Sequence, residues 1–341
     1  MNYSNKNGSS ESPITILPLT KQRELTAWIA TTLAVSVIGI LNNIFVLRVT
    51  WPVTQRISGV SLLISHFVVV NLLICLVSLP ASIFVIILTQ HYGSLIAGRS
   101  CYYIQTLWIV NVSVVNWSDA GLVGNRFVAL YFPHSYKLWM TTRVSAAIIV
   151  GSWILCIGVM LPFTLASVGQ RVALSALGQC SLVVTGRLGS FFNSFMAFVP
   201  YAVSGTGSLF ILRKCFGFSK LRSGRVRHEA RVQADATANR RLITARMLLF
   251  TFLWCGVCML PTYLTIVVFP WLYVSNSVSI LWTKTAMACQ YAFTPCILLL
   301  TNRIIENERE SSLLEDGPPL SRQLLTLHQG DRRVQFRPHG R

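Results

Sequence analysis

Two ionisable side chains, Asp119 and Arg126, lie inside the largely apolar stretch 99–131. Seven residues span about two helical turns, so in a helix both side chains would share one face, about 10 Å apart. Ionisable groups at membrane depth are costly and usually functional. We therefore expect Asp119 to form a polar or ion-binding site in the core with Asn43, Asn71 and Thr294. The alternative is a protonated carboxyl group that is hydrogen-bonded to one neighbour.

Patterns typical of enzymes are missing from the sequence. It has no paired His-Glu metal helix, no P-loop and no glycine-rich dinucleotide turn. The run Gly205-Thr206-Gly207 lies in an apolar stretch and indicates close helix packing. His66 is a lone histidine, which more often has a structural role than a ligand-binding one. We expect no enzyme activity, no cofactor and no metal ion.

The composition indicates a membrane protein. Of the 341 residues, 53% are hydrophobic and only 12% are charged, whereas soluble domains carry about 25% charged residues. A membrane-spanning helix needs about 20 mainly apolar residues. Seven stretches meet this need, at 25–48, 59–88, 99–131, 144–166, 190–212, 243–269 and 277–301. The sequence predicts an all-α membrane protein with a bundle of seven transmembrane helices.

Lysine and arginine are unevenly distributed between the loops. They gather in the first loop, after the third stretch and above all after the fifth, while the alternate loops carry few. Because cytoplasmic loops carry the excess of positive charge, the N-terminus should lie outside and the C-terminus in the cytoplasm. The net charge of +18 therefore belongs to loops and tail, and we expect no nucleic-acid partner.

Two of the nine cysteines, Cys101 and Cys180, lie in polar connecting stretches, while most of the others lie in apolar runs. They are the best candidates for a disulfide, which would form on the oxidising side of the membrane. The loops that hold them are the ones that the charge distribution puts outside. Asn2 and Asn7 begin Asn-X-Ser glycosylation acceptors in the N-terminal tail, on the same side.

Three segments follow: an extracellular tail over 1–24, the bundle over 25–302 and a cytoplasmic tail over 303–341. Residues 302–314 mix isoleucine and leucine with charged residues. This mixture predicts a short amphipathic helix on the membrane surface, with membrane lipid as its partner.

Each predicted span carries at least one landmark residue. In chain order the landmarks are Asn43, Asn71 with Pro80, Cys101 with Arg126, Trp153 with Pro162, Pro200, Cys258 to Pro261, and Thr294 with Pro295. The ordered set resembles the rhodopsin-like (class A) family of G-protein-coupled receptors. The resemblance implies a receptor in which Arg126 faces a heterotrimeric G protein.

Several switch motifs depart from the family pattern, and they define the expected coupling site. Asn125-Arg126-Phe127 replaces Asp-Arg-Tyr, Met259 replaces the tryptophan before Pro261, Thr294-Pro295 replaces Asn-Pro, and Asn71 replaces a sodium-binding aspartate. Because the acidic neighbour is absent, Arg126 should be less restrained, which predicts raised basal signalling. The alternative is an arginine that only reaches the headgroups.

The resemblance implies a ligand pocket in the outer halves of spans three, six and seven. Its expected residues are Gln105, Trp108, Ile109, Tyr263, Lys284 and Met287. Trp108 stands where amine receptors have an aspartate, which argues against an amine ligand. Lys284, with Arg171 or Arg187, would meet a carboxylate or a phosphate, so a peptide C-terminus and an acidic lipid both fit. Lys284 could instead simply extend to the outer headgroups.

We therefore expect a multi-pass receptor of the plasma membrane that transmits the binding of an extracellular ligand to heterotrimeric G proteins. Two alternatives remain at this point. One is a receptor-like scavenger or scaffold that does not couple, which the altered switch motifs favour. The other is a seven-span transporter, against which the halves show no evident internal repeat.

Overall fold

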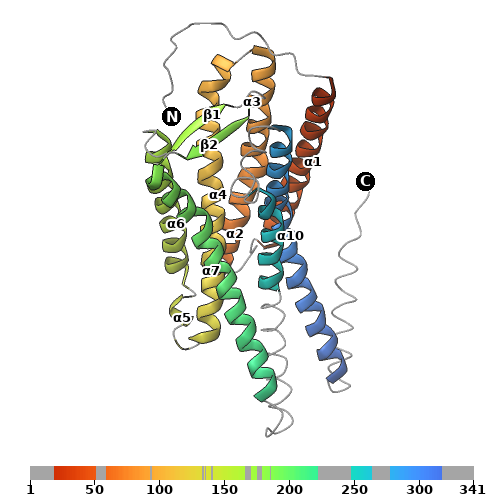
Figure 1. Cartoon of the computed structure of the whole chain (residues 1–341). Coiled ribbons are helices and arrows are strands. Elements are labelled where there is room, and N and C mark those ends of the chain that lie inside the picture. The colour runs from red at the N-terminus through yellow and green to blue at the C-terminus, as the bar shows by residue number, and fades with distance from the viewer. Residues whose placement is uncertain are drawn as a thin grey trace, which may run out of the picture.

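The computed structural model describes residues 19–50, 59–92, 94–132, 134, 136–139, 141–165, 170–174, 179–184, 186–221, 247–262 and 277–316. Long helical rods run side by side through this part of the chain (Figure 1). They are α1 (Leu19–Thr50), the continuous rod of α2 (Gly59–Leu73), η1 (Ile74–Ser78) and α3 (Leu79–Tyr92), α4 (Ser94–Tyr131), α6 (Thr142–Leu165), α7 (Gly186–Leu221), the helix Met247–Thr262 and α10 (Ser277–Asp316). The short helix α5 (Tyr136–Trp139) lies between α4 and α6.

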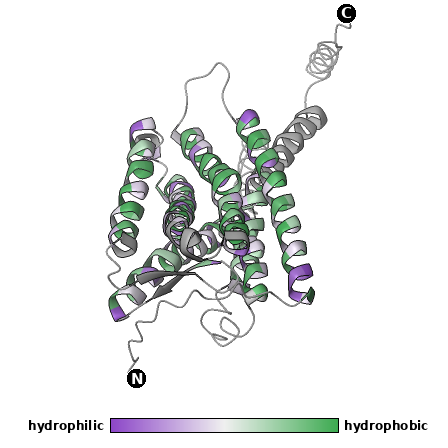
Figure 2. Ribbon diagram, turned by 90° about the horizontal axis from the view of Figure 1, so that it is seen from above, coloured by the Kyte–Doolittle hydropathy of each residue, from purple (hydrophilic) through white to green (hydrophobic). Residues whose placement is uncertain are grey.

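The rods coincide with the seven apolar stretches, so the predicted bundle is confirmed. Four of them, Leu19–Thr50, Gly59–Gln90, Thr142–Pro162 and Gly186–Cys215, are long and apolar enough to cross a membrane, and Met247–Thr262 is a shorter apolar helix. Hydrophobic residues cover most of the rods, and hydrophilic ones lie mainly towards their ends (Figure 2). Large apolar side chains such as Leu41, Ile154 and Val257 are more than 60% exposed. Lipid would cover such a surface, which is far more apolar than that of a soluble monomer.

A main apolar cluster fills the middle of the bundle. Its buried members come from the rods of α2, α4, α6, α7 and α10 and from the helix Met247–Thr262; they include Phe67, Ile74, Val114, Cys156, Met160, Met196, Met259 and Tyr291. The first rod, α1, packs along α10 and along the second rod. The third rod, α4, packs along the second rod, α6 and α7 at once. A side chain on α4 can therefore be positioned against several neighbours.

The second rod widens into a π-helical turn at η1, just before Pro80. The N–H of Leu79 donates to the carbonyl of Ile74, five residues back, instead of to Cys75. Proline disturbs the turn before it, because its ring meets the carbonyl four residues earlier and it has no N–H. The released carbonyl of Cys75 accepts a hydrogen bond from Ser36 Oγ of α1 at 2.6 Å. The distortion thereby ties the first rod to the second.

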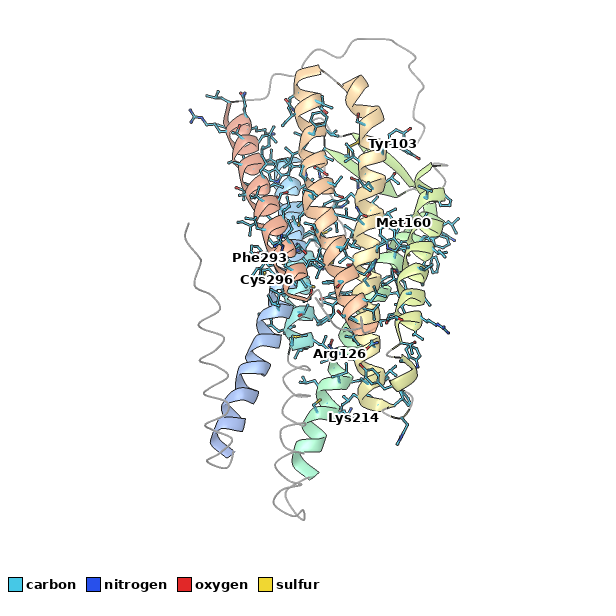
Figure 3. The ribbon with its side chains drawn as sticks, turned by 180° about the vertical axis from the view of Figure 1, so that it is seen from behind. Tyr103, Arg126, Met160, Lys214, Phe293 and Cys296 are labelled. Carbon is cyan, nitrogen blue, oxygen red and sulfur yellow. A yellow bond between two sulfur atoms is a disulfide. The ribbon has the colours of Figure 1, made fainter. Side chains whose placement is uncertain are left out.

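A two-stranded antiparallel hairpin lies between α6 and α7. Strand β1 (Gln170–Leu174) pairs with β2 (Cys180–Val184), with Leu174 opposite Cys180. The sequence analysis did not predict these strands. We call the end of the bundle that the hairpin covers the hairpin end (Figure 1), and the opposite end, towards which Figure 3 labels Arg126, the Arg126 end.

The predicted surface helix over 302–314 is helical, but it is the continuation of α10 and not a separate element. After Pro295 the sequence has no glycine or proline until Gly317. Nothing in the local sequence therefore breaks the helix at residue 302, and it ends at Asp316.

Candidate functional site

The predicted disulfide is confirmed. Cys101, near the start of α4, and Cys180, the first residue of β2, are bonded with a Cα–Cα distance of 5.4 Å. Both cysteines are buried and pack with Val85 and Ile104. The bond fixes the hairpin over the ends of the third and second rods. The hairpin thereby forms one wall of a cavity that lies beneath it.

This hairpin-end cavity has a volume of about 20 Å³. Its lining comes from α1, α3, α4, α10 and the hairpin: Trp28, Thr32, Leu79, Ser82, Ile86, Trp108, Gln179, Cys180, Leu281, Lys284 and Thr285. Lys284 Nζ donates a hydrogen bond to the carbonyl of Cys180 at 2.8 Å. The ammonium group of Lys284 is thus held between α10 and the hairpin, next to a space that fits about one water molecule.

Of the six predicted pocket residues, Trp108 and Lys284 line this cavity. Gln105 and Met287 are buried, and Ile109 is partly buried against the main cluster, but none of these three is part of the lining. Tyr263 lies outside the described residues. Of the two arginines predicted to act with Lys284, Arg187 is exposed at the start of α7 and does not line this cavity, and the side chain of Arg171 lies outside the described part of the chain.

The first rod contributes a part of this cavity that the sequence analysis missed. Trp28 Nε1 donates to Thr285 Oγ1 at 2.8 Å, and Thr32 Oγ1 lies 2.8 Å from the same oxygen. Trp28 and Thr32 are four residues apart, so both lie on one face of α1. That spacing was a signal of a shared face, although it did not identify α10 as the partner.

Asp119 lies about two thirds of the way along α4 and lines two small cavities. The upper one, towards the hairpin end, measures about 20 Å³ and is lined by Phe67, Asn116, Asp119, Tyr201, Ser204, Phe252, Cys255 and Gln290. The lower one measures about 40 Å³ and is lined by Asp119, Arg126, Ser204, Ser208 and Thr251 among apolar residues of several rods. Asp119 therefore faces α7, the helix Met247–Thr262 and α10.

The residues expected to share a core site with Asp119 make other contacts. Asn43 Nδ2 donates to the carbonyls of Gly39 at 2.8 Å and Tyr291 at 3.2 Å. Asn71 Nδ2 donates to the carbonyl of Phe67 at 2.7 Å. Neither residue lines the two cavities beside Asp119, and neither does Thr294, which is buried next to Cys255. The residues that share the upper cavity with Asp119 come mainly from α7, the helix Met247–Thr262 and α10.

Arg126 is partly buried and lines the lower cavity together with Asp119. Its neighbour Asn125 is buried, and Asn125 Oδ1 accepts a long hydrogen bond of 3.5 Å from Tyr136 of α5. Phe127 stacks on Tyr131 with ring centres 4.4 Å apart. Asn125 thus joins α4 to the short helix α5, a contact that an aspartate would also accept.

Several contacts hold α4 to α7 at the Arg126 end. Figure 3 labels Arg126 of α4 and Lys214 of α7 towards this same end of the bundle. Tyr131 Oη donates to the carbonyl of Phe210 at 3.1 Å, and Lys214 Nζ lies 3.8 Å above the Tyr131 ring. An apolar cluster joins the same rods to the helix Met247–Thr262; its buried members are Val123, Ile211, Cys215, Met247 and Leu248. We call this set the closing cluster, because it seals the three rods together beside Arg126.

The remaining predicted switch residues lie in the middle of the bundle. Met259 is buried in the main cluster, and Pro261 is partly buried two residues further along. Thr294 and Pro295 are buried in α10. Among the described residues Thr294 Oγ1 has no hydrogen-bond partner of acceptable geometry. Met259, Pro261, Thr294 and Pro295 are therefore separate from the closing cluster.

His66 makes two polar contacts that fit a structural role. Trp153 Nε1 donates to His66 Nε2 at 2.9 Å, and His66 Nδ1 lies 3.3 Å from Ser118 Oγ. An indole N–H can only donate, so Nε2 accepts and the proton must be on Nδ1. The Ser118 hydroxyl group donates its own hydrogen bond to the carbonyl of Val114 at 2.7 Å, so its oxygen can accept from His66 Nδ1. A neutral histidine thus links α2, α4 and α6.

Residues 42–301 match the family model of the 7 transmembrane receptor (rhodopsin family), and this match covers most of the chain. The chain belongs to this family of receptors. It is accordingly a multi-pass membrane protein of a family whose members are receptors and not enzymes. A comparison with curated proteins finds no match.

Proposed function

We propose that this chain is a plasma-membrane receptor that transmits the binding of an extracellular ligand at its hairpin end to a heterotrimeric G protein at its Arg126 end. The observation that carries the proposal is the closing cluster. Arg126 lines a cavity that this cluster seals, so separation of α7 and the helix Met247–Thr262 from α4 would open the cavity and expose Arg126. Such a change between two packings is how a bundle transmits a signal.

The orientation is supported by chemistry at both ends. The disulfide needs an oxidising compartment, and it lies at the hairpin end. Arg126, Arg143, Arg213 and Lys214 lie towards the opposite ends of their rods, as the excess of positive charge on the cytoplasmic side requires. The glycosylation acceptors Asn2 and Asn7 lie outside the described residues and stay predictions of this orientation.

Lys284 supports an acidic ligand. Its ammonium group lies at a cavity that holds about one water molecule and is already bonded to the Cys180 carbonyl. A ligand carboxylate or phosphate would replace a neutral acceptor by an anionic one, and charge-assisted hydrogen bonds are roughly twice as strong. Entry of the ligand must enlarge the cavity, so binding would draw Lys284 and the hairpin apart and change the packing of α10.

A ligand screen with matched head groups tests this assignment. Cells expressing the chain are exposed to fatty acids, lysophospholipids and peptides with free or amidated C-termini, and G-protein activation is measured. We expect acidic compounds to be the active ones, and Lys284→Met to raise their half-maximal concentration about 10-fold or more, since a lost charged contact costs on the order of 1.5–3 kcal/mol. Lys284→Arg should retain part of the response.

The matched control is Thr283→Val, because the hydroxyl of Thr283 bonds to the carbonyl of Ile280 in its own helix. This variant should respond as the wild type does. A ligand that acts equally on Lys284→Met and the wild type, or a set of active compounds without an anionic group, would exclude Lys284 as the anion-binding residue.

A further inference from the structure

Two aromatic rings and two glycines lock α7 to the helix Met247–Thr262. The rings of Tyr201 on α7 and Phe252 on the shorter helix stack with their centres 4.6 Å apart. A Cβ atom at Gly205 would lie 2.7 Å from the Phe252 ring, and a Cβ atom at Gly256 would meet Tyr201 Oη. Each rod therefore places one ring against a glycine of the other rod. We call these four residues the interlock.

The interlock is reciprocal, and this restricts how the two rods can move. Tyr201 and Gly205 are four residues apart on α7, and Phe252 and Gly256 are four residues apart on the other rod, so each pair shares one face. One turn away from each glycine, in both directions, the residue carries a large side chain. A shift of one rod along the other would therefore move both rings from a glycine onto a larger residue, which a close-packed interior resists.

The contact between α4 and α7 is one-sided by comparison. Val123 of α4 packs against Gly207, where a Cβ atom would lie 2.6 Å from Val123 Cγ1. Two glycines of α4 do not receive a side chain of α7 in return: Gly121 meets a side chain of α6, and Gly124 has open space beside it. Because only one rod inserts a side chain here, α7 can move away from α4 without a ring passing a backbone.

The polar contacts between α4 and α7 lie near the Arg126 end of the rods. Tyr131 Oη donates to the exposed carbonyl of Phe210 at 3.1 Å, and Lys214 Nζ lies over the Tyr131 ring. Water can replace such contacts at an exposed site, so their net contribution is small. The stacked rings of the interlock lie among apolar residues further inside the bundle, where water offers no replacement. Of the two interfaces of α7, the one with α4 is therefore the weaker.

We propose that the interlock makes α7 and the helix Met247–Thr262 one rigid unit, which moves away from α4 as a whole when the Arg126 cavity opens. The gap then forms between α4 and this unit, and the two rods of the unit stay together. Only the consequence of this opening, the exposure of Arg126 to a G protein, rests on the proposed function. The rigid unit is a property of the bundle itself.

The test measures distances between rods in the full-length protein in lipid nanodiscs, without ligand or G protein. Spin labels on genetically encoded amino acids replace Leu209 of α7, Phe250 of the shorter helix and Val150 of α6, which are all exposed. The three distances are measured by double electron–electron resonance. Gly207→Leu acts as a wedge, because its side chain must push α7 away from Val123 of α4.

We expect the wedge to increase both distances from the α6 label by several ångströms, while the distance between the other two labels keeps its mean and its width. Adding Phe252→Ala to Gly207→Leu removes one ring of the interlock and should broaden the distance between α7 and the shorter helix. The matched control is Leu253→Ala, which removes an exposed side chain next to Phe252. It should leave that distance as it is in Gly207→Leu alone.

A second measurement tests the interlock in the closed bundle. Gly256→Ala should lower the melting temperature in detergent, and Tyr201→Phe in the same protein should restore most of it. The added Cβ atom meets only the Tyr201 hydroxyl group closely, since the next atom, Tyr201 Cζ, lies 3.7 Å away. Gly151→Ala on α6 is the control, because nothing lies within 4 Å of a Cβ atom there.

Three results would overturn the proposal. The first is a larger distance between α7 and the shorter helix in Gly207→Leu, which would show that the two rods part from one another. The second is an absence of any change in the three distances, which would show that the α4 side is not the one that yields. The third is a loss in Gly256→Ala that Tyr201→Phe does not restore. Gly207→Ala is the milder wedge if Gly207→Leu does not fold. Because no G protein is present, these results are independent of whether the receptor couples.

Discussion

Replacing both Cys101 and Cys180 by serine is expected to lower the free energy of unfolding by about 2–5 kcal/mol. The bond closes a loop with a sequence separation of 79 residues and holds β2 over the hairpin-end cavity. Without it, the Cys180 carbonyl is no longer held beside Lys284, and the lysine loses its acceptor. We therefore expect both a lower melting temperature and a loss of surface expression, measured by thermal unfolding and by an N-terminal epitope tag.

The control for this variant is Cys289→Ser, which alters a partly buried thiol that is not in a disulfide. It should behave nearly as the wild type does. A double-serine protein with wild-type melting temperature and surface level would mean that the bundle itself positions the hairpin, and that the disulfide contributes nothing to the pocket.

Gly39→Ala is expected to destabilise the bundle, although alanine normally favours a helix by about 1 kcal/mol over glycine. A Cβ atom at position 39 would lie 2.6 Å from Cys75 Sγ and 3.0 Å from the Cβ of Ala292. Alanine must therefore push α1 away from the second rod and from α10 at the level of the π-helical turn. Overpacking of this kind costs about 1–3 kcal/mol, and Gly39→Val should cost more. The measurement is the melting temperature in detergent.

Gly158→Ala on α6 is the matched control, because nothing lies within 4 Å of a Cβ atom there. It should leave the melting temperature unchanged or raise it slightly. A second variant tests the cause: Gly39→Ala combined with Cys75→Ala removes the sulfur atom and should recover part of the loss. If Gly39→Ala is as stable as Gly158→Ala, the close approach of these three rods is not a determinant of stability.

The sequence predicted the elements of the fold better than their contacts. Runs of about 20 apolar residues are sufficient to define spanning helices, since each such helix satisfies its own backbone in lipid. Cys101 and Cys180 were identifiable because they differ in surroundings from most of the other cysteines. Pro80 is a local signal for the disturbed turn at η1, but no local pattern shows that the released carbonyl of Cys75 accepts a hydrogen bond from Ser36 of α1.

The polar core shows why the remaining contacts could not be predicted. The sequence singled out Asp119 and paired it with Asn43, Asn71 and Thr294, whereas the polar residues that share its upper cavity include Ser204 and Gln290. Helical spacing tells which residues share a face, while the rotation and tilt of each rod decide which faces meet. Those angles depend on many small contacts, such as Gly205 against Phe252 and Gly207 against Val123, where the predicted close packing of α7 is found.

The measurement that tests the receptor function most directly is guanine-nucleotide exchange on purified heterotrimeric G proteins. The chain is reconstituted in lipid nanodiscs and compared with Arg126→Ala, using representatives of each G-protein class, with and without an active compound from the acidic screen. The control is Arg143→Ala, an exposed arginine at the start of α6 that does not line the Arg126 cavity.

We predict that the wild-type chain and Arg143→Ala accelerate exchange on at least one class, with measurable basal activity, and that Arg126→Ala reduces this acceleration about 10-fold or more, since it removes a charged contact. A folded chain that leaves exchange unchanged in every class, with and without the compound, would contradict coupling and favour a receptor-like scavenger or scaffold.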